Sequence, residues 1–393
     1  ELVWADSNNF WAARFADLDS DGRTEIIGRT DDLFLVRENE DGSFFAKIAE
    51  LKNFTAGSNF AGVPHAEIAD FDGDSRQEIL LGDADGDLYI YEATSNNQFA
   101  ATWSDSLPLV DSSDYIRAGD FDGDGRRDFM AGCHSSLEIN AEHEFEGRHW
   151  LFRLYRASGD NQFEVAWEQR FLGVQSPRDF DAGVGAGDID GDGREEFFLN
   201  LFPDMYVIAY ESGEARVVWH EQIAQSNTTI VAALESNQPA AFFYSNGKSF
   251  QAFSLPNQNT GAPAPQNLAA TPLDENRVQL HWAAAPGAEG YALYRAAQDS
   301  ALRALAMTAS TSYRDAGLTS EQDYRYAVAT IDSQYAPPRG ILSHEVNARP
   351  SSAPRVLAAY FVPPHFVGVT FSEPMLDALR ATEHFQLHRE ESE

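Results

Sequence analysis

The stretch "AGDFDGDGRRDFMAG" (residues 118–132) places an acidic loop between two short apolar segments. Aspartates occupy alternate positions, Asp120, Asp122 and Asp124, and another acid follows at Asp128. A short alternating segment leads into the loop and a second, apolar segment follows it, which predicts a β-strand on each side. Because so many like charges repel one another, the loop needs a partner of opposite charge.

The same plan occurs four times along the chain. The copies are "ARFADLDSDGRTEIIG" (13–28), "AEIADFDGDSRQEILLG" (66–82), "IRAGDFDGDGRRDFMAG" (116–132) and "GVGAGDIDGDGREEFFLN" (183–200). A second hairpin pattern recurs between copies, as in "GDLYIYEATSNNQFAATWSD" (86–105). Each unit therefore supplies four strands, which is typical of β-propeller blades, whereas the 3.6-residue period of helical repeats is missing.

A fifth unit, residues 228–255, keeps the strand rhythm without the aspartates. It has three strand-like segments, and residues 1–7 resemble an isolated fourth strand. Two arrangements are open: these two pieces pair and close a ring of five blades, or further blades precede Glu1.

The composition changes at a Pro-, Gly- and Asn-rich stretch that predicts a domain boundary. Short alternating segments then predict an antiparallel sandwich, with Trp282, Tyr294, Leu318 and Tyr324 as core and corner residues. Beyond Arg349, two strand-like segments are too few for a sandwich, so we expect only the start of a third domain. The expected all-β organisation is a β-propeller (1–257), a linker (258–263), a sandwich (264–349) and an incomplete domain (350–393).

The acidic loops share the spacing Asp-x-Asp-x-Asp-Gly-x-x-Asp/Glu. We number its residues as positions 1 to 9, and we number the four loops in chain order. A hard cation resolves the repulsion, since Ca²⁺ takes oxygen ligands at about 2.3–2.6 Å and an additional backbone oxygen can come from position 7. We therefore predict about four Ca²⁺ sites. Their ligands are Asp17, Asp19, Asp21, Arg23 and Glu25; Asp70, Asp72, Asp74, Arg76 and Glu78; Asp120, Asp122, Asp124, Arg126 and Asp128; and Asp188, Asp190, Asp192, Arg194 and Glu196, each arginine through its backbone oxygen only.

Position 6 is predicted to adopt a positive φ, and it is glycine in three of the loops. Ser75 stands there in the second loop, so we expect strain of about 1–3 kcal/mol and weaker binding at that site. An EF-hand is not expected, because position 12 carries no glutamate and the flanking segments are strand-like. Magnesium is disfavoured because its small octahedral shell accommodates few carboxylates.

These motifs resemble FG-GAP repeats, the calcium-bearing blades of integrin α-like (VCBS) propellers, over about residues 1–255. The chain departs from that pattern at Ser75, in its loop-free fifth unit, and in showing five units where integrin-like propellers have seven. The stretch from "PQNLAATPLDENRVQLHW" (265–282) resembles a fibronectin type III domain, and "VTFSEPM" (369–375) resembles the start of a bacterial Ig-like domain. The resemblance implies an extracellular setting, either secreted or on the cell surface of a bacterium.

Charge, apolar segments and missing motifs argue against several partners and activities. A formal charge of −34 disfavours nucleic acid or an anionic membrane as partner, and no segment is long and apolar enough for a membrane-spanning helix. Hydrolase, kinase and dinucleotide motifs are absent from the sequence. An insertion at residues 133–150 gathers histidines and glutamates but lacks His-Glu-x-x-His spacing. We interpret it as a solvated loop, and a partner-binding or metal-binding loop is the alternative.

We therefore expect a non-enzymatic, calcium-stabilised adhesion or scaffold module whose propeller loops bind a protein or a polysaccharide. Four equivalent loops favour structural over catalytic calcium, because a catalytic centre is normally unique. Two alternatives remain: an accessory, non-catalytic region of a secreted polysaccharide lyase or peptidase, and a lectin-like propeller.

Overall fold

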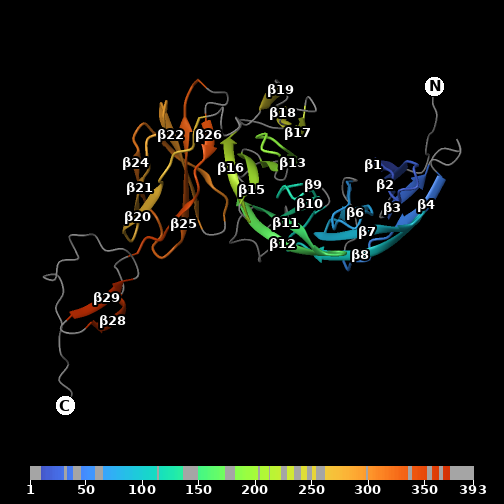
Figure 1. Ribbon diagram of the computed structural model, residues 1–393, viewed down its shortest axis with the longest axis horizontal. Helices are drawn as coiled ribbons and strands as arrows, with labels where there is room; N and C mark the ends of the chain where they lie inside the picture. The colour runs from blue at the N-terminus through green and yellow to red at the C-terminus, as the bar shows by residue number, and fades with distance from the viewer. Residues whose placement is uncertain are drawn as a thin grey trace, which may run out of the picture.

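The computed structural model describes residues 10–30, 33–38, 46–57, 65–112, 115–135, 149–172, 182–201, 204–211, 213–222, 228–233, 240–245, 250–253, 262–297, 300–334, 339–351, 356–362 and 366–371. These residues form β-strands and turns, with no helix among them (Figure 1). The expected all-β class is confirmed for this part of the chain.

Four antiparallel sheets of four strands follow one another, each with its strands side by side in chain order. The first two sheets contain β1 (Trp11–Ala16), β2 (Glu25–Thr30), β3 (Leu33–Glu38) and β4 (Ala46–Leu51), then β5 (Glu67–Ala69), β6 (Glu78–Gly82), β7 (Asp87–Ser95) and β8 (Gln98–Ser106). The next two contain β9 (Ile116–Gly119), β10 (Asp128–His134), β11 (His149–Gly159) and β12 (Gln162–Leu172), then β13 (Ala182–Gly187), β14 (Glu196–Leu201), β15 (Asp204–Glu211) and β16 (Glu214–Gln222). The prediction of four strands per unit is confirmed.

The fifth sheet has three strands, β17 (Thr228–Ala233), β18 (Ala240–Ser245) and β19 (Phe250–Phe253), as expected. It is tied to the fourth sheet by a hydrogen bond of 2.5 Å from the Ala240 amide to the carbonyl of Asp188. The expected isolated strand at residues 1–7 lies outside the described residues.

Successive sheets contact each other through their first strands, β1 with β5, β5 with β9, β9 with β13 and β13 with β17. The sheets are arranged in an arc that starts at β1–β4 and leads to β17–β19 (Figure 1). Within the described residues this is a series of packed sheets, and the closed ring of a propeller is not seen.

The middle strands of a sheet that packs between two others are apolar on both faces. In β6, Ile79 and Leu81 contribute to the core shared with the first sheet, whereas Leu80 contributes to the core shared with the third. Alternate side chains of a strand point to opposite faces, so a strand buried on both sides reads as a continuous apolar segment. The ring centroids of Phe71 and Phe129 lie 5.3 Å apart edge to face between the second and third sheets.

A two-sheet sandwich follows. One sheet contains β20 (Ala269–Asp274), β21 (Arg277–His281) and β24 (Ser312–Ala316), and the other contains β23 (Arg303–Thr308), β22 (Gly290–Ala297), β25 (Tyr324–Ile331), β26 (Arg339–Leu342) and β27 (Val346–Ala348). Trp282, Leu318 and Tyr324 lie in its core, as predicted. The Tyr324 hydroxyl accepts a hydrogen bond of 2.9 Å from the Thr319 amide, which is the tyrosine corner of immunoglobulin-like sandwiches. Beyond it, β28 (Val356–Val362) pairs with β29 (Phe366–Phe371), and the rest of the expected Ig-like segment is not described.

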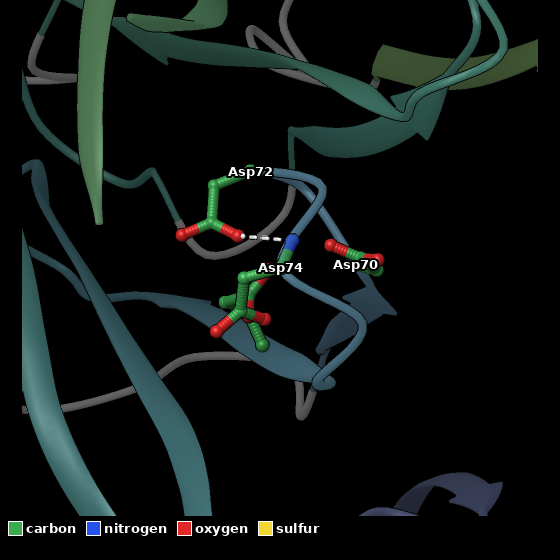
Figure 2. A group of neighbouring side chains, drawn as sticks. Asp70, Asp72 and Asp74 are labelled. Atoms are coloured by element: carbon green, nitrogen blue, oxygen red, sulfur yellow. Dashed lines mark hydrogen bonds between the residues drawn. The ribbon is translucent and has the colours of Figure 1, made fainter. Parts of the chain in front are cut away.

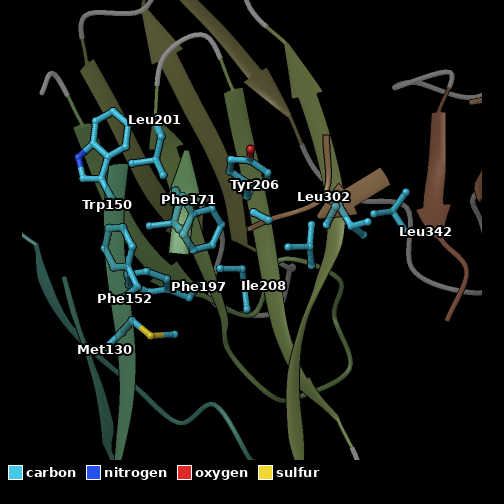
Figure 3. Packing of buried hydrophobic residues seen from close by; sticks show 14 of the residues in the cluster. Met130, Trp150, Phe152, Phe171, Phe197, Leu201, Tyr206, Ile208, Leu302 and Leu342 are labelled. Atoms are coloured by element: carbon cyan, nitrogen blue, oxygen red, sulfur yellow. The ribbon is translucent and has the colours of Figure 1, made fainter. Parts of the chain in front are cut away.

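The sandwich packs directly against the third and fourth sheets. Along β22, Tyr291 and Leu293 face the sandwich core, whereas Ala292, Tyr294 and Ala296 join a core shared with these sheets. Figure 3 shows this shared core, which runs from Met130 and Trp150 through Tyr206 to Leu302 and Leu342. Tyr294, expected in the sandwich core, is thus buried on the opposite face, because β22 is covered on both sides.

A buried polar network lies at the same joint. Asp204, whose side chain is 2% exposed, pairs with Arg303 of the sandwich at 2.5 Å and lies 2.8 Å from Nε2 of His220. Burial alone would raise the pKa of Asp204, but the hydrogen bond from His220 and the charge of Arg303 outweigh it and hold that pKa below its ordinary value. The carboxylate therefore stays charged and joins the two parts.

We expect Arg303→Ala to lower the free energy of unfolding by about 1–3 kcal/mol, because it leaves a buried carboxylate without its cationic partner. Arg277→Ala is the control, since it removes an exposed pair with Asp274. Thermal unfolding followed by circular dichroism should show a lower melting temperature for Arg303→Ala only. Equal melting temperatures for the two variants would contradict a stabilising joint.

Candidate metal-binding loops

All four acidic loops connect the first strand of a sheet to its second. Position 9 of each loop is the first residue of that second strand: Glu25 begins β2, Glu78 begins β6, Asp128 begins β10 and Glu196 begins β14. The predicted strand–loop–strand arrangement is confirmed, and all twenty predicted ligand residues lie among the described residues.

Hydrogen bonds within each loop hold the carboxylates in place. In the second loop, Asp70 accepts from the amides of Gly73 (2.7 Å) and Ser75 (2.9 Å), and Asp72 accepts from the amide of Asp74 at 3.1 Å. Figure 2 shows the three aspartates of this loop with the Asp74–Asp72 bond drawn. The third and fourth loops repeat the same pattern from Asp120 and Asp188.

Position 6 has the predicted positive φ in every loop. The angles are 86° at Gly22, 76° at Ser75, 87° at Gly125 and 93° at Gly193. Ser75 therefore adopts a left-handed conformation that glycine takes without steric penalty. The strain expected at that residue is present in the backbone.

The carboxylate at position 9 is buried beneath its loop. One oxygen accepts a hydrogen bond from the amide of position 2, at 2.7 Å for Leu18 to Glu25 and 2.6 Å for Phe71 to Glu78. The other oxygen, Oε1 in both glutamates, is buried and has no hydrogen-bond partner among the described residues. Oδ2 of Asp128 is in the same situation. A buried acceptor without a donor is costly, and a cation in the loop would satisfy it.

The carboxylates also converge. Oxygens of Asp70, Asp72, Asp74 and Glu78 all lie within 4.8 Å of one another, so the second loop brings its four predicted side-chain ligands together. In the first loop Asp17, Asp19 and Glu25 meet this criterion, and in the third loop Asp120, Asp122 and Asp124 do.

Burial and mutual repulsion raise the pKa at position 9. The values are about 7 for Glu25, about 8 for Glu78, about 7 for Asp128 and about 8 for Glu196. Desolvation is the largest cause in each case, and the aspartates of the same loop add to it. Near neutral pH these groups therefore take up either a proton or a cation.

Two asparagines that the sequence analysis missed complete the first and second loops. The backbone amide of Asn97, in the β7–β8 turn, donates a hydrogen bond of 2.5 Å to Oδ2 of Asp19. The backbone amide of Asn161, in the β11–β12 turn, donates one of 2.6 Å to Oδ2 of Asp72. Both have positive φ, 57° and 52°. Each loop is thus contacted by the hairpin turn of the following sheet. The recurring "NQF" at both turns is a signal that could have pointed to them.

The arginines at position 7 do more than expected. Each was predicted to contribute only a backbone oxygen, yet the guanidinium of Arg126 also pairs with Asp124 at 2.7 Å, and Arg194 forms the same pair with Asp192. These pairs neutralise part of the charge at position 5.

Other clusters are less complete. Asp83, Asp85 and Asp87 converge in the β6–β7 turn, where Asp83 already accepts hydrogen bonds from Asn53 and from the amides of Asp85 and Asp87. In the insertion, His134 and His149 are buried, whereas Glu138, His143 and Glu144 lie outside the described residues.

Comparison with known proteins finds one matching family model and several solved structures similar to part of the chain. Residues 70–131, which contain the second and third loops, match the family described as FG-GAP-like repeat. No curated protein matches the chain.

Several of the solved structures similar to part of the chain are described as fibronectin type III domains. An Fn3-like protein from Clostridium thermocellum is 27% identical, with a TM-score of 0.21, over 25% of this chain and 100% of that one. The fn3 domain of human contactin 1 is 21% identical, with a TM-score of 0.22, over 28% of this chain and 94% of that one. The FN5 domain of Drosophila Lar is 18% identical, with a TM-score of 0.20, over 23% of this chain and 97% of that one. Among the described residues, no helix is long and apolar enough to cross a membrane.

The raised pKa values predict how stability depends on pH when a chelator keeps the loops free of metal. A carboxyl group whose pKa is higher in the folded than in the unfolded state binds more protons when folded, so stability falls as pH rises between the two values. In EDTA, the melting temperature should therefore fall from about pH 5 to about pH 8. The melting temperature of Glu78→Gln should fall less steeply over this range, because the substitution removes one of the carboxyl groups that take up a proton. A melting temperature that rises over this range in EDTA would refute the prediction.

Proposed function

We propose that this chain is a non-enzymatic, calcium-stabilised module of an extracellular protein, in which a β-propeller and sandwich domains present a binding surface. The observation that carries the proposal is the second loop, where four carboxylates converge and the buried Oε1 of Glu78 has no donor within the part of the chain that the structure describes. A divalent cation supplies positive charge to all four groups at once.

Calcium suits this donor set best. The proposed ligands of the second site are Asp70, Asp72, Asp74 and Glu78, with the backbone oxygen of Arg76, and the corresponding residues serve the other loops. All of these donors are oxygens, which favours a hard cation, and the number of carboxylates favours calcium over magnesium. Bound calcium would hold the first strand of a sheet to its second.

A structural role for the ion follows from repetition. Each loop takes its ligands from one short segment and recurs sheet by sheet, whereas a catalytic centre is normally unique and combines its metal with a base or a nucleophile. We therefore assign the loops to stabilisation and infer no catalytic activity for this chain.

The arc of packed sheets supports the propeller as the arrangement of residues 1–257, because consecutive four-stranded sheets meet through their first strands. We assign residues 350–393 to the start of an Ig-like domain. FG-GAP-like and fibronectin type III-like modules together favour a secreted or cell-surface bacterial protein that adheres to a protein or a polysaccharide.

Chelation tests the proposal. Each site adds about 2.7 kcal/mol when free calcium exceeds its Kd a hundredfold, so EDTA should lower the melting temperature by several degrees and excess CaCl₂ should restore it. Asp72→Asn should reduce this calcium-dependent shift, because it weakens one site. Asp274→Asn, an exposed substitution in the sandwich, is the matched control and should leave the shift intact. A melting temperature that ignores both EDTA and calcium would refute structural calcium.

A further inference from the structure

The third loop differs from the second at one position of the neighbouring strand. In the second sheet Glu78 pairs with Glu92 of β7. In the third sheet Phe129 pairs with Tyr155, so the next residues on the two strands, Asp128 and Arg156, face each other. Arg156 thus has the place of Glu92, and each residue is five positions before the asparagine of its hairpin turn.

The guanidinium of Arg156 lies among the acids of the third loop. It is hydrogen-bonded to Asp122, its Nη2 is 3.9 Å from Oδ2 of Asp124, and its Nε is 3.7 Å from Oδ1 of Asp128. On its other side it lies 5.5 Å from the ring centroid of Tyr210. A fixed positive charge therefore contacts the carboxylates at positions 3, 5 and 9 at once.

The second loop has the opposite charge at this place. Glu92 is 2% exposed and pairs with Arg76 at 2.5 Å, and its other oxygen accepts a hydrogen bond from Asn161. Oxygens of Asp74, Glu92 and Asp160 lie within 4.8 Å of one another. The second loop thus has an additional carboxylate where the third loop has a cation.

We propose that Arg156 serves as a built-in cation for the third loop, so that this loop binds calcium much more weakly than the other three. The proposal rests on the calcium function proposed above and changes its stoichiometry. A divalent ion in the third loop would have to displace the guanidinium from Asp122 or share the site with a like charge. Strain at Ser75, which is expected to weaken binding at the second loop, is different in kind: it is a backbone cost, whereas Arg156 competes for the ligand oxygens themselves.

The first test compares two loops in the otherwise unchanged full chain. Protein stripped with EDTA and dialysed is titrated with CaCl₂ by isothermal titration calorimetry. We expect about three tight ions in the parent chain, with a third-loop affinity at least about tenfold weaker, which corresponds to about 1.4 kcal/mol. Asp72→Asn should remove one tight ion, and Asp122→Asn should remove none. Loss of a tight ion in Asp122→Asn would overturn the proposal.

The second test removes the guanidinium of Arg156 from the third loop. Arg156→Gln should add one tight ion, and combining it with Asp122→Asn should remove that ion again. Arg153→Gln, which removes an arginine of the same strand that pairs with Glu168, is the control and should add none. An Arg156→Gln chain that keeps its circular dichroism spectrum and gains no ion would overturn the proposal. If Arg156→Gln does not fold, the comparison of Asp72→Asn with Asp122→Asn decides the matter. Binding of no calcium by the parent chain would refute the calcium function itself, and the proposal with it.

Discussion

A carboxylate is buried where the second strand of each of the first four sheets begins, directly beneath a loop that is itself acidic. Glu25 and Glu78 are both 0% exposed, and their amide contacts fix the start of the strand, so they are part of the fold as well as of the loop. Such a group is tolerated only if a proton or a cation offsets its charge. The first two strands of each sheet therefore depend on an electrostatic balance as much as on their apolar core.

The features that sequence reasoning predicted are local ones. A few adjacent residues and their repetition determine the loop spacing, the positive φ at position 6 and the strands on either side. Repetition also allowed us to predict a positive φ with backbone strain at Ser75. The sandwich was predictable for the same reason, since alternating segments and the pair Leu318 and Tyr324 determine its core and corner. Ring closure by residues 1–7 falls outside the described residues, so it stays a prediction.

Contacts between sheets were not predictable from these patterns. Asn97 reaches Asp19 across 78 residues of chain, Asn161 reaches Asp72 across 89, and Arg303 reaches Asp204 across 99. The alternation of apolar residues and the loop spacing predict which residues face outward from a sheet. They do not predict which residues of a neighbouring sheet these contact. Tyr294 illustrates the limit: its burial was foreseen, but the face was wrong because nothing local indicates that β22 is covered on both sides.

The joint between the sandwich and the fourth sheet determines how force would pass through the molecule. The core shared by Tyr206, Tyr294 and Leu302, together with the pair Asp204–Arg303, connects the two parts over a broad area, in addition to the segment of chain that links them. Tension applied through the sandwich is therefore distributed over β16, β22 and β26, and separating the parts requires many contacts to break together. For a chain under mechanical load, this geometry resists extension better than a flexible tether of the same length would.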